Sequence, residues 1–214
     1  MKHEHLQEIN STQDYLLALN PRDEYLVSCE RQTAGRGRYG RVWNEQDGSL
    51  SFSFNLKPSH VMTHSPLEVA VLINQFFENK LRLKWPNDLF DKDIKKCGGI
   101  LIDSKGSNLI VGVGLNFFEN QDFGAIGLKD KKLFKREMAA DIYQYILSNR
   151  MHSEQVLATW EKYCIHMHQQ VKIEDTLGEF IGLGPQGEAI LKVHGATTQS
   201  FFSGSLLFGE NVVS

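Results

Sequence analysis

The sequence is poor in the features that would place the protein in an oxidising compartment or a membrane. It contains three cysteines, Cys29, Cys97 and Cys164, and no C-x-x-C pair, which argues against a disulfide framework, a zinc site and a redox motif. No segment approaches the ~18 consecutive apolar residues of a membrane-spanning helix, and no apolar run follows Met1–His5 as in a signal peptide. These absences predict a soluble cytoplasmic protein with reduced core thiols.

An excess of positive charge is also absent. The formal net charge of the 214 residues is −3, which argues against a protein that binds nucleic acid over its whole surface. Hydrophobic residues make up 41% and charged residues 23% of the chain, as in ordinary globular proteins. This length is sufficient for one core, or for a domain of ~160 residues with a small appendage.

Positive charge is nevertheless concentrated in one segment, Arg31–Trp43, here called the arginine–glycine segment. It contains no acidic residue, and its arginines and glycines are Arg31, Arg36, Arg38, Arg41, Gly35, Gly37 and Gly40. The glycines predict an irregular loop, whose guanidinium groups can hold phosphate oxygens through bidentate hydrogen bonds. The spacing also fits G-x-G-x-x-G, but turn residues at Asn44–Ser49 and a strand follow where a dinucleotide-binding fold needs a helix. A solvated or RNA-binding segment is the remaining alternative.

Hydrophobic periodicity predicts a mixture of strands and helices up to residue 168. The predicted strands are Tyr25–Glu30, Leu50–Leu56, Leu81–Trp85, Lys95–Asp103 and Leu109–Phe117, and the predicted helices begin at Ser11 or span Ser65–Lys80, Asp130–Leu147 and Ser153–His168. Leu50–Leu56 alternates strictly between apolar and polar residues, which predicts one buried face. Ser11 and Thr12 are expected to cap their helix, or to accept a small polar ligand at its N-terminus.

Two of the predicted strands contain glycines in their interiors. These glycines are Gly98, Gly99, Gly112 and Gly114. Glycine weakens a strand, so its repeated use indicates either a backbone kept free for a ligand or a pair of β-bulges.

Beyond Val171 the pattern changes to short β runs separated by tight turns, at intervals of roughly 8 to 12 residues. Such spacing is typical of a small barrel, and we expect an SH3-like module. The predicted division is a first domain of residues 1–168 and a second of residues 169–214. His166 and His168 lie next to this boundary without a third ligand at metal spacing, which disfavours zinc there.

Four motifs occur in order along the chain. They are Gly35–Trp43 (G-R-G-R-Y-G-R-V-W), Lys84–Asp88 (K-W-P-N-D), Lys96–Leu101 (K-C-G-G-I-L) and Gly112–Asn116 (G-V-G-L-N). Together they make the chain resemble the biotin protein ligases, in the short form without an N-terminal DNA-binding domain, over nearly its whole length. The resemblance implies an α+β fold, with a mixed sheet flanked by helices as in the class II synthetase-like catalytic domain of biotin and lipoate ligases.

The resemblance also implies an activity and its ligands. Members of this family activate biotin with ATP and Mg²⁺ to biotinyl-5′-AMP and transfer the biotin to a lysine of a biotin carboxyl carrier protein. The implied biotin-binding residues are Ser11, Thr12, Gln32, Gly35, Arg36, Lys96, Gly98, Gly99, Gly112 and Gly114. The implied ATP-binding residues are Arg36, Gly37, Arg38, Arg41, Trp43, Lys84, Asn87, Asp88, Lys96 and Asn116. The family commonly has Ser-Thr-Asn where this chain has Ser11-Thr12-Gln13, so a contact from Gln13 is left out.

The chemistry of the reaction assigns roles to four of these side chains. Attack of a carboxylate on the α-phosphate brings two anions together, and Arg36, Arg38 and Lys96 are the cations expected to stabilise the developing charge. Lys95 alternates to the other face of its strand and is expected to be solvated. The acceptor lysine must lose a proton although an ordinary lysine has a pKa near 10.4, and Asp88 is the candidate base or, alternatively, a Mg²⁺ ligand.

Other functions remain as alternatives. A lipoate protein ligase shares the fold and the adenylation logic, and a non-catalytic biotin- or nucleotide-binding protein would use the same pocket. A DNA-binding repressor is disfavoured because fewer than a dozen residues precede Ser11, too few for a helix-turn-helix. We therefore expect no DNA or membrane partner, and leave a homodimer through sheet edges as an open possibility.

Overall fold

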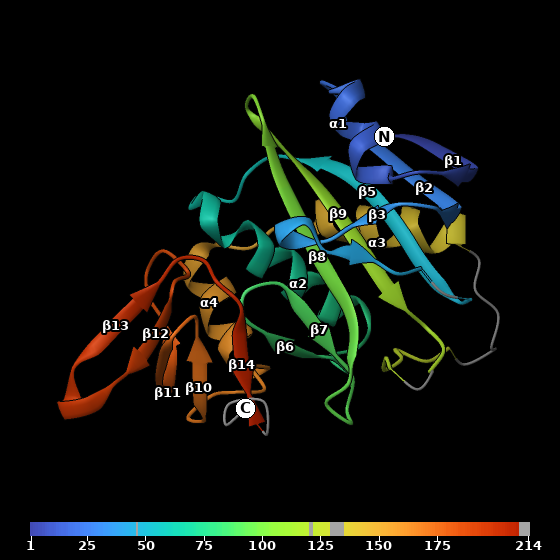
Figure 1. Cartoon of the computed structure of the whole chain (residues 1–214). Coiled ribbons are helices and arrows are strands. Elements are labelled where there is room, and N and C mark those ends of the chain that lie inside the picture. Colours follow the sequence, from blue (N-terminus) through green and yellow to red (C-terminus); the bar gives the residue numbers. More distant parts are fainter. Residues whose placement is uncertain (46, 120–121, 129–134, 210–214) are drawn as a thin grey trace.

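The longest strands of the chain pair into one mixed sheet. The computed structural model describes residues 1–214 except 46, 120–121, 129–134 and 210–214. In spatial order the strands of the seven-stranded sheet are β1 (Lys2–Ile9), β2 (Tyr25–Gln32), β5 (Ser49–Leu56), β9 (Asn108–Asn116), β8 (Lys96–Lys105), β7 (Asp88–Phe90) and β6 (Arg82–Lys84). Strands β1 and β2 are parallel and all other neighbours are antiparallel, which confirms the mixed sheet (Figure 1).

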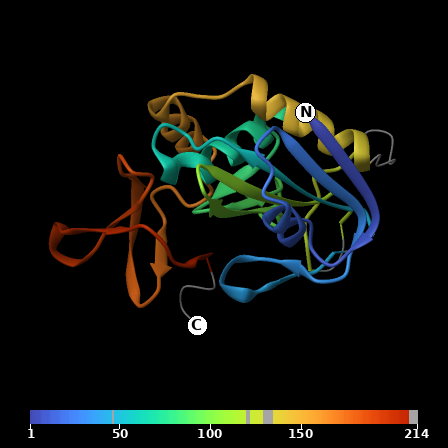
Figure 2. The same cartoon turned by 90° about the horizontal axis from the view of Figure 1, so that it is seen from above.

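Helices cover both faces of this sheet. The α-helices are α1 (Thr12–Leu19), α2 (Ser65–Phe76), α3 (Lys135–Ser148) and α4 (Ser153–Lys162), and short 3₁₀ turns are η1 (Arg38–Gly40), η2 (Met62–His64) and η3 (His194–Ala196). Helices α2, α3 and α4 lie on one side of the sheet (Figure 2). Helix α1 lies on the other side, together with a small hairpin formed by β3 (Gly35–Arg36) and β4 (Val42–Trp43).

Strand β5 is buried on both faces, so the prediction of a single buried face was wrong. Its even-numbered residues, such as Phe52 and Phe54, pack in the main core against the helices. Its odd-numbered residues, such as Ser51 and Ser53, are buried too, because α1 and the β3–β4 hairpin cover them. The polar half of the alternation therefore faces a second layer of the protein instead of solvent.

Several element ends differ from the sequence prediction. Helix α2 stops at Phe76 instead of Lys80, where Glu78 and Asn79 adopt positive φ angles of 58° and 61° that no α-helix contains. Helix α4 stops at Lys162 instead of His168, because the chain turns back and forms backbone hydrogen bonds with β6. The first residues predicted for α3, 130–134, lie outside the described residues. Strand β1 was not predicted at all.

The C-terminal part forms a separate five-stranded antiparallel sheet. In spatial order its strands are β13 (Thr198–Phe201), β12 (Ala189–Lys192), β11 (Thr176–Leu183), β10 (Gln170–Ile173) and β14 (Leu206–Phe208). The predicted β runs are confirmed, while closure into an SH3-like barrel and the division after residue 168 stay predictions. Phe180 and Leu206 belong to the same buried cluster as Phe52 and Trp85, so the core is continuous between the two sheets.

Within the described ranges, no helix is both long and apolar enough to cross a membrane.

Candidate active site

The strand register brings small residues together at the centre of the large sheet. Ser51, Gly114, Gly99, Asp88 and Lys84 are direct neighbours across five strands and form one row. In the parallel row two residues away, Gly112 lies between Ser53 on β5 and Leu101 on β8. Because opposed residues share a face of the sheet, the glycines form a shallow floor, over which lies a cavity of about 200 Å³.

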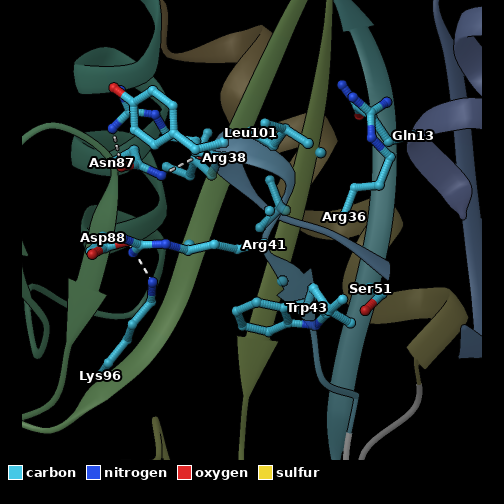
Figure 3. A pocket seen from close by; sticks show the side chains of 18 of the residues that line it. Gln13, Arg36, Arg38, Arg41, Trp43, Ser51, Asn87, Asp88, Lys96 and Leu101 are labelled. Atoms are coloured by element: carbon cyan, nitrogen blue, oxygen red, sulfur yellow. Dashed lines mark hydrogen bonds and ion pairs between the residues drawn. The ribbon is translucent and has the colours of Figure 1, made fainter. Parts of the chain in front are cut away.

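One end of the cavity, here called the charged end, holds Lys84, Asn87, Asp88 and Lys96 (Figure 3). Lys96 Nζ donates to Asp88 Oδ1 at 2.6 Å, and Lys84 Nζ donates to Asp88 Oδ2 at 3.4 Å. Burial lowers the pKa of Lys84; Asp88 opposes this shift, while the positive charges of Lys96 and Arg41 add to it. One carboxylate thus holds two ammonium groups at the place where the sequence motifs predicted the reaction.

The turn that carries Asn87 and Asp88 is fixed from both sheets. It contains a cis peptide bond between Trp85 and Pro86. The Trp85 backbone N–H donates to His166 Nε2 at 3.1 Å, and its indole Nε1–H donates to the Gly187 carbonyl in the C-terminal part at 3.1 Å. Burial, helped by the charge of Lys84, lowers the pKa of His166 to about 3, so the ring is neutral and able to accept this hydrogen bond.

The arginine–glycine segment forms a hairpin over the cavity, where the sequence predicted an irregular loop. The Gly37 N–H donates to the Arg41 carbonyl at 2.7 Å, and Tyr39 at the tip has a φ of 56°. Arg38 Nη1 donates to Asn87 Oδ1 at 3.0 Å, which anchors the hairpin at the charged end. The Tyr39 hydroxyl accepts a hydrogen bond from the Gly204 N–H at 2.9 Å, so the tip also contacts the C-terminal part.

Arg36 is held at the opposite end of the cavity from Lys96. Its Nη1 lies 2.5 Å from Asp14 Oδ1 and 3.8 Å from Asp103 Oδ2. In Figure 3 its side chain is directed toward Gln13, whereas Arg38 lies near Asn87 and Arg41 extends toward the Asp88 side. Arg38 and Lys96 thus line the same cavity, whereas the Arg36 guanidinium is turned toward Asp14 and Asp103.

The other end of the cavity, here called the neutral end, consists of uncharged polar side chains from α1, β2 and β5. They are Ser11, Thr12, Gln13, Gln32 and Ser53. Ser11 Oγ accepts from the Asp14 N–H at 3.2 Å, which confirms that it caps α1. Thr12 Oγ1 lies 3.0 Å from Gln32 Oε1 and 2.9 Å from Ser53 Oγ, so these side chains hold one another in place.

Most residues proposed from the motifs line this one cavity. Those that do are Ser11, Thr12, Gln32, Arg36, Gly37, Arg38, Arg41, Trp43, Lys84, Asn87, Asp88, Lys96, Gly99, Gly112 and Gly114. Gly35, Gly98 and Asn116 do not. A Cβ on Gly98 would meet Leu115 at 2.9 Å, so this position faces the core.

The two other residues outside the lining have structural contacts instead. A Cβ on Gly35 would come within 2.7 Å of the Trp43 carbonyl oxygen, so glycine is needed there for the hairpin to close. Asn116 is buried, and its Oδ1 accepts from Ser49 Oγ at 2.8 Å. Lys95, predicted to be solvated, is exposed on the surface and pairs with Glu119 at 2.6 Å.

Sequence reasoning missed three groups of lining residues. Gln13 was left out because it departs from the family pattern, yet it lies at the neutral end. Ser51 and Ser53 were assigned to an outer face, although the same alternation would have identified them had a second covering layer been considered. The Gly204–Leu206 segment reaches the cavity from the C-terminal part, and no local sequence pattern indicates this.

The site does not fit a resident magnesium ion. Both carboxylate oxygens of Asp88 are paired with lysine ammonium groups, which compete with a cation for the same lone pairs. In the part of the chain that the structure describes, no group of three His, Cys, Asp or Glu side chains is placed to hold a metal.

Comparisons with known proteins agree with this geometry. A human biotin–protein ligase is 26% identical over 79% of this chain, and the Bacillus subtilis bifunctional ligase/repressor BirA is 28% identical over 88% of it. The chain spans 28% of the length of the human protein and 67% of that of the Bacillus protein. A biotin protein ligase from Aquifex aeolicus, solved in complex with biotin and ATP, is 26% identical, with a TM-score of 0.80 over 97% of this chain and 99% of its own.

A second solved structure supports the fold alone. It is the biotin acetyl coenzyme A carboxylase synthetase of Helicobacter pylori, 20% identical, with a TM-score of 0.73 over 93% of this chain and 99% of its own. The model of the biotin/lipoate A/B protein ligase family matches residues 6–116, which include all four motifs and most of the cavity lining. This protein therefore belongs to the biotin/lipoate A/B protein ligase family.

Proposed function

We propose that this protein is a biotin protein ligase, which forms biotinyl-5′-AMP from biotin and ATP and then transfers the biotinyl group to a lysine of a carrier protein. The observation that carries the proposal is a single cavity that places a lysine–aspartate–lysine cluster beside the arginine–glycine hairpin. Support for biotin over lipoate comes from the Aquifex relative, which was solved with biotin and ATP and matches nearly the whole chain.

In the first step, a biotin carboxylate oxygen would attack the α-phosphorus, and the bond to the bridging oxygen of pyrophosphate would break. Two anions must approach each other, so fixed cations at the reacting atoms lower the barrier. Lys96 and Arg38 would supply such cations, and the support is that Asp88 holds Lys96 and Asn87 holds Arg38 at this end of the cavity. Arg36 would take part only after leaving Asp14, because its guanidinium is now turned to that carboxylate.

In the second step, the neutral amine of a carrier lysine would attack the biotinyl carbonyl carbon, and AMP would leave. Asp88 is the candidate base for the proton that the amine must lose. The test is Asp88→Asn with adenylate formation and biotin transfer measured separately. Retained adenylation with transfer reduced at least tenfold would support the base role, and loss of adenylation alone would refute it.

We also make proposals about the carrier protein, the magnesium ion, the cellular compartment and the oligomeric state. We take the carrier to be the biotin carboxyl carrier domain of acetyl-CoA carboxylase. The support is a Paracoccus denitrificans protein named biotin–[acetyl-CoA-carboxylase] ligase, 30% identical over 47% of this chain and of its own length. Magnesium would enter as MgATP, bound to the substrate's phosphates instead of to a protein site. We also propose that the enzyme is cytoplasmic and that it forms a homodimer through the β1 edge of the large sheet.

Mass spectrometry gives the most direct test. The protein is incubated with biotin and MgATP, and the intact complex is measured under native conditions. The expected result is a retained mass equal to biotinyl-5′-AMP, with no retained lipoyl-AMP in a parallel incubation with lipoate in place of biotin. Formation with lipoate alone would move the protein to the lipoate branch of the family, and formation with neither would leave a binding protein.

A further inference from the structure

His166 lies where the two sheets meet, next to the turn that carries Asn87 and Asp88. Its side chain is completely buried, and the ring of Phe180 from the C-terminal sheet lies 4.4 Å away between ring centroids. The ring is neutral, and its Nε2 is 3.1 Å from the Trp85 backbone nitrogen. A backbone N–H can only donate, so Nε2 must be the unprotonated nitrogen of this ring.

The other ring nitrogen, Nδ1, must therefore carry the proton. A neutral imidazole has one N–H donor and one acceptor nitrogen, and the donor needs an acceptor when it is buried. Among the residues that the structure describes, the partner of His166 Nδ1 is Cys164 Sγ, 2.8 Å away. The sulfur consequently accepts this hydrogen bond. The tautomer of His166 is thus determined by a donor on one side of the ring and an acceptor on the other.

The backbone on both sides of Cys164 holds its sulfur in front of this ring. The Leu83 N–H donates to the Tyr163 carbonyl at 2.9 Å, and the Ile165 N–H donates to the Leu83 carbonyl at 3.0 Å. These two hydrogen bonds join the segment to β6, the strand that leads into the turn. The position of the acceptor is therefore set by the large sheet itself.

The Cys164 thiol is suited to accepting a hydrogen bond and unsuited to reacting. Burial raises its pKa to about 12, although the backbone N–H groups of His166 and Met167 oppose this shift. The group is then a neutral thiol at physiological pH, and the thiolate is the reactive form of cysteine. Its sulfur nevertheless keeps lone pairs that can face the Nδ1 proton.

The tautomer affects the cavity through the turn. Asn87 and Asp88, which hold Arg38 and Lys96, follow closely after Trp85. If the ring proton moved to Nε2, it would face the backbone N–H of Trp85, and two donors cannot bond to each other. The turn would lose this hydrogen bond, and the side chains that it carries would be placed less accurately.

We propose that Cys164 is a positioning residue for the proposed reaction: its sulfur keeps the proton of His166 on Nδ1, so that Nε2 accepts the hydrogen bond from the Trp85 N–H. The effect on the reaction rate rests on the function proposed above, whereas the effect on the tautomer does not. The arrangement requires an acceptor at position 164. Serine should therefore replace cysteine, whereas valine, which is of similar size and has no acceptor, should not.

The experiment compares the full chain with Cys164→Ser, Cys164→Val and Cys29→Val. The last variant is a matched control, because Cys29 is also a buried thiol but its Sγ donates, to the Ser51 carbonyl at 3.8 Å. Nitrogen-15 NMR distinguishes the protonated from the unprotonated ring nitrogen of His166. Hydrogen exchange reports on the Trp85 N–H, and pyrophosphate release reports on adenylate formation.

The expected result differs between the two substitutions of Cys164. In Cys164→Val, Nε2 of His166 should become protonated, and exchange of the Trp85 N–H should accelerate by about tenfold. The kcat for adenylate formation should fall by about three- to tenfold, with the KM for biotin nearly unchanged. Cys164→Ser and Cys29→Val should keep the wild-type tautomer, exchange rate and kcat.

A double variant separates positioning from packing. In the His166→Phe background no ring proton is left to accept, so Cys164→Val should lower kcat no further. A further loss as large as in the wild-type background would overturn the positioning role. Equal losses of kcat in Cys164→Ser and Cys164→Val, with the tautomer unchanged in both, would overturn it as well.

The wild-type spectrum alone is also decisive. A proton on Nε2 of His166 in the wild-type protein would overturn the inference even if Cys164→Val does not fold. Absence of adenylate formation by the wild type would instead overturn the proposed function. In that case the spectra and the exchange rate of the Trp85 N–H would still decide whether Cys164 sets the tautomer.

Discussion

The two ends of the cavity hold their side chains in different ways. At the charged end, each carboxylate oxygen of Asp88 is paired with a lysine ammonium group, and the turn that carries Asp88 is fixed by His166 and Gly187. At the neutral end, Thr12, Gln32 and Ser53 bond to one another, while Gln13 Oε1 is buried without a hydrogen-bond partner among the residues that the structure describes. The charged end is thus held by opposite charges, whereas the neutral end is held by hydrogen bonds between uncharged groups.

This difference predicts different consequences of substitution. Changes at the charged end should mainly lower the rate, because in the proposed reaction the charges there would stabilise the transition state. Changes at the neutral end should mainly lower affinity, because the contacts there are made equally in the ground state and the transition state.

The largest effect is expected for Lys96→Met. Removing the ammonium group takes away one of the fixed cations proposed to offset the repulsion between the approaching anions, and kcat for adenylate formation should fall by about 10²- to 10³-fold. The measurement is biotin-dependent release of pyrophosphate. Lys95→Met is the matched control, since Lys95 is exposed and paired with Glu119, and it should retain near-normal activity. Equal losses of activity in both variants would contradict the proposal that the side chains of the charged end determine the reaction rate.

A smaller effect on affinity is expected for Gly114→Ala in the cavity floor. The added Cβ would lie 2.4 Å from Trp43 Cε2, so the indole must move from its place in the cavity wall. The Kd for biotin, measured by calorimetry, should rise by about tenfold, with less change in kcat. Gly99→Ala is the comparison, because a Cβ there meets no atom closer than 3.7 Å. Similar Kd values for the two variants would contradict the prediction that a clash between the added Cβ and Trp43 weakens biotin binding.

The charged end should also become less stable in acid because of His166. Its pKa is lowered from 6.5 to about 3 in the folded protein, so between these values the unfolded chain binds a proton that the folded chain does not. The contribution is fully present above pH 6.5 and is lost as the pH falls, by about 1.4 kcal/mol per pH unit. Urea unfolding of the wild type and His166→Phe should show a smaller pH slope in the variant. Parallel slopes would show that the ring does not stay neutral.

The smallest effect is expected for Asp14→Asn, which removes the partner of Arg36. Both side chains are more than 40% exposed, so the pair contributes at most about 1 kcal/mol. Freeing the guanidinium should lower the KM for ATP by about two- to fivefold in low salt, and less at high ionic strength. Glu8→Gln, which removes the similarly exposed pair with Arg31, should leave KM unchanged. A raised KM in Asp14→Asn would mean that the pair holds Arg36 in its working position.

Local patterns in the sequence predicted those parts of the fold in which neighbouring residues decide the structure. Strict alternation identified β5, and the positions of the arginines and glycines identified the segment over the cavity. Strand β1 was missed because it is an edge strand of polar residues, which is held by parallel pairing with β2 instead of by an apolar face.

Contacts between distant residues explain the other differences. Asp14, Arg36 and Asp103 meet only after α1, β3 and β8 have come together, and no spacing rule connects them. The end of α4 was misjudged because backbone pairing with β6 outweighs the helical pattern of the residues beyond Lys162. In each case the tertiary structure overrides a local preference.

The hydrogen bond from the Trp85 indole to the Gly187 carbonyl connects the turn that carries Asn87 and Asp88 to a residue 102 positions later in the chain. Together with the continuous core, it couples the two sheets mechanically. A calorimeter should therefore record one cooperative melting transition for both sheets, and during synthesis this turn gains its last side-chain hydrogen bond only after Gly187 has been added.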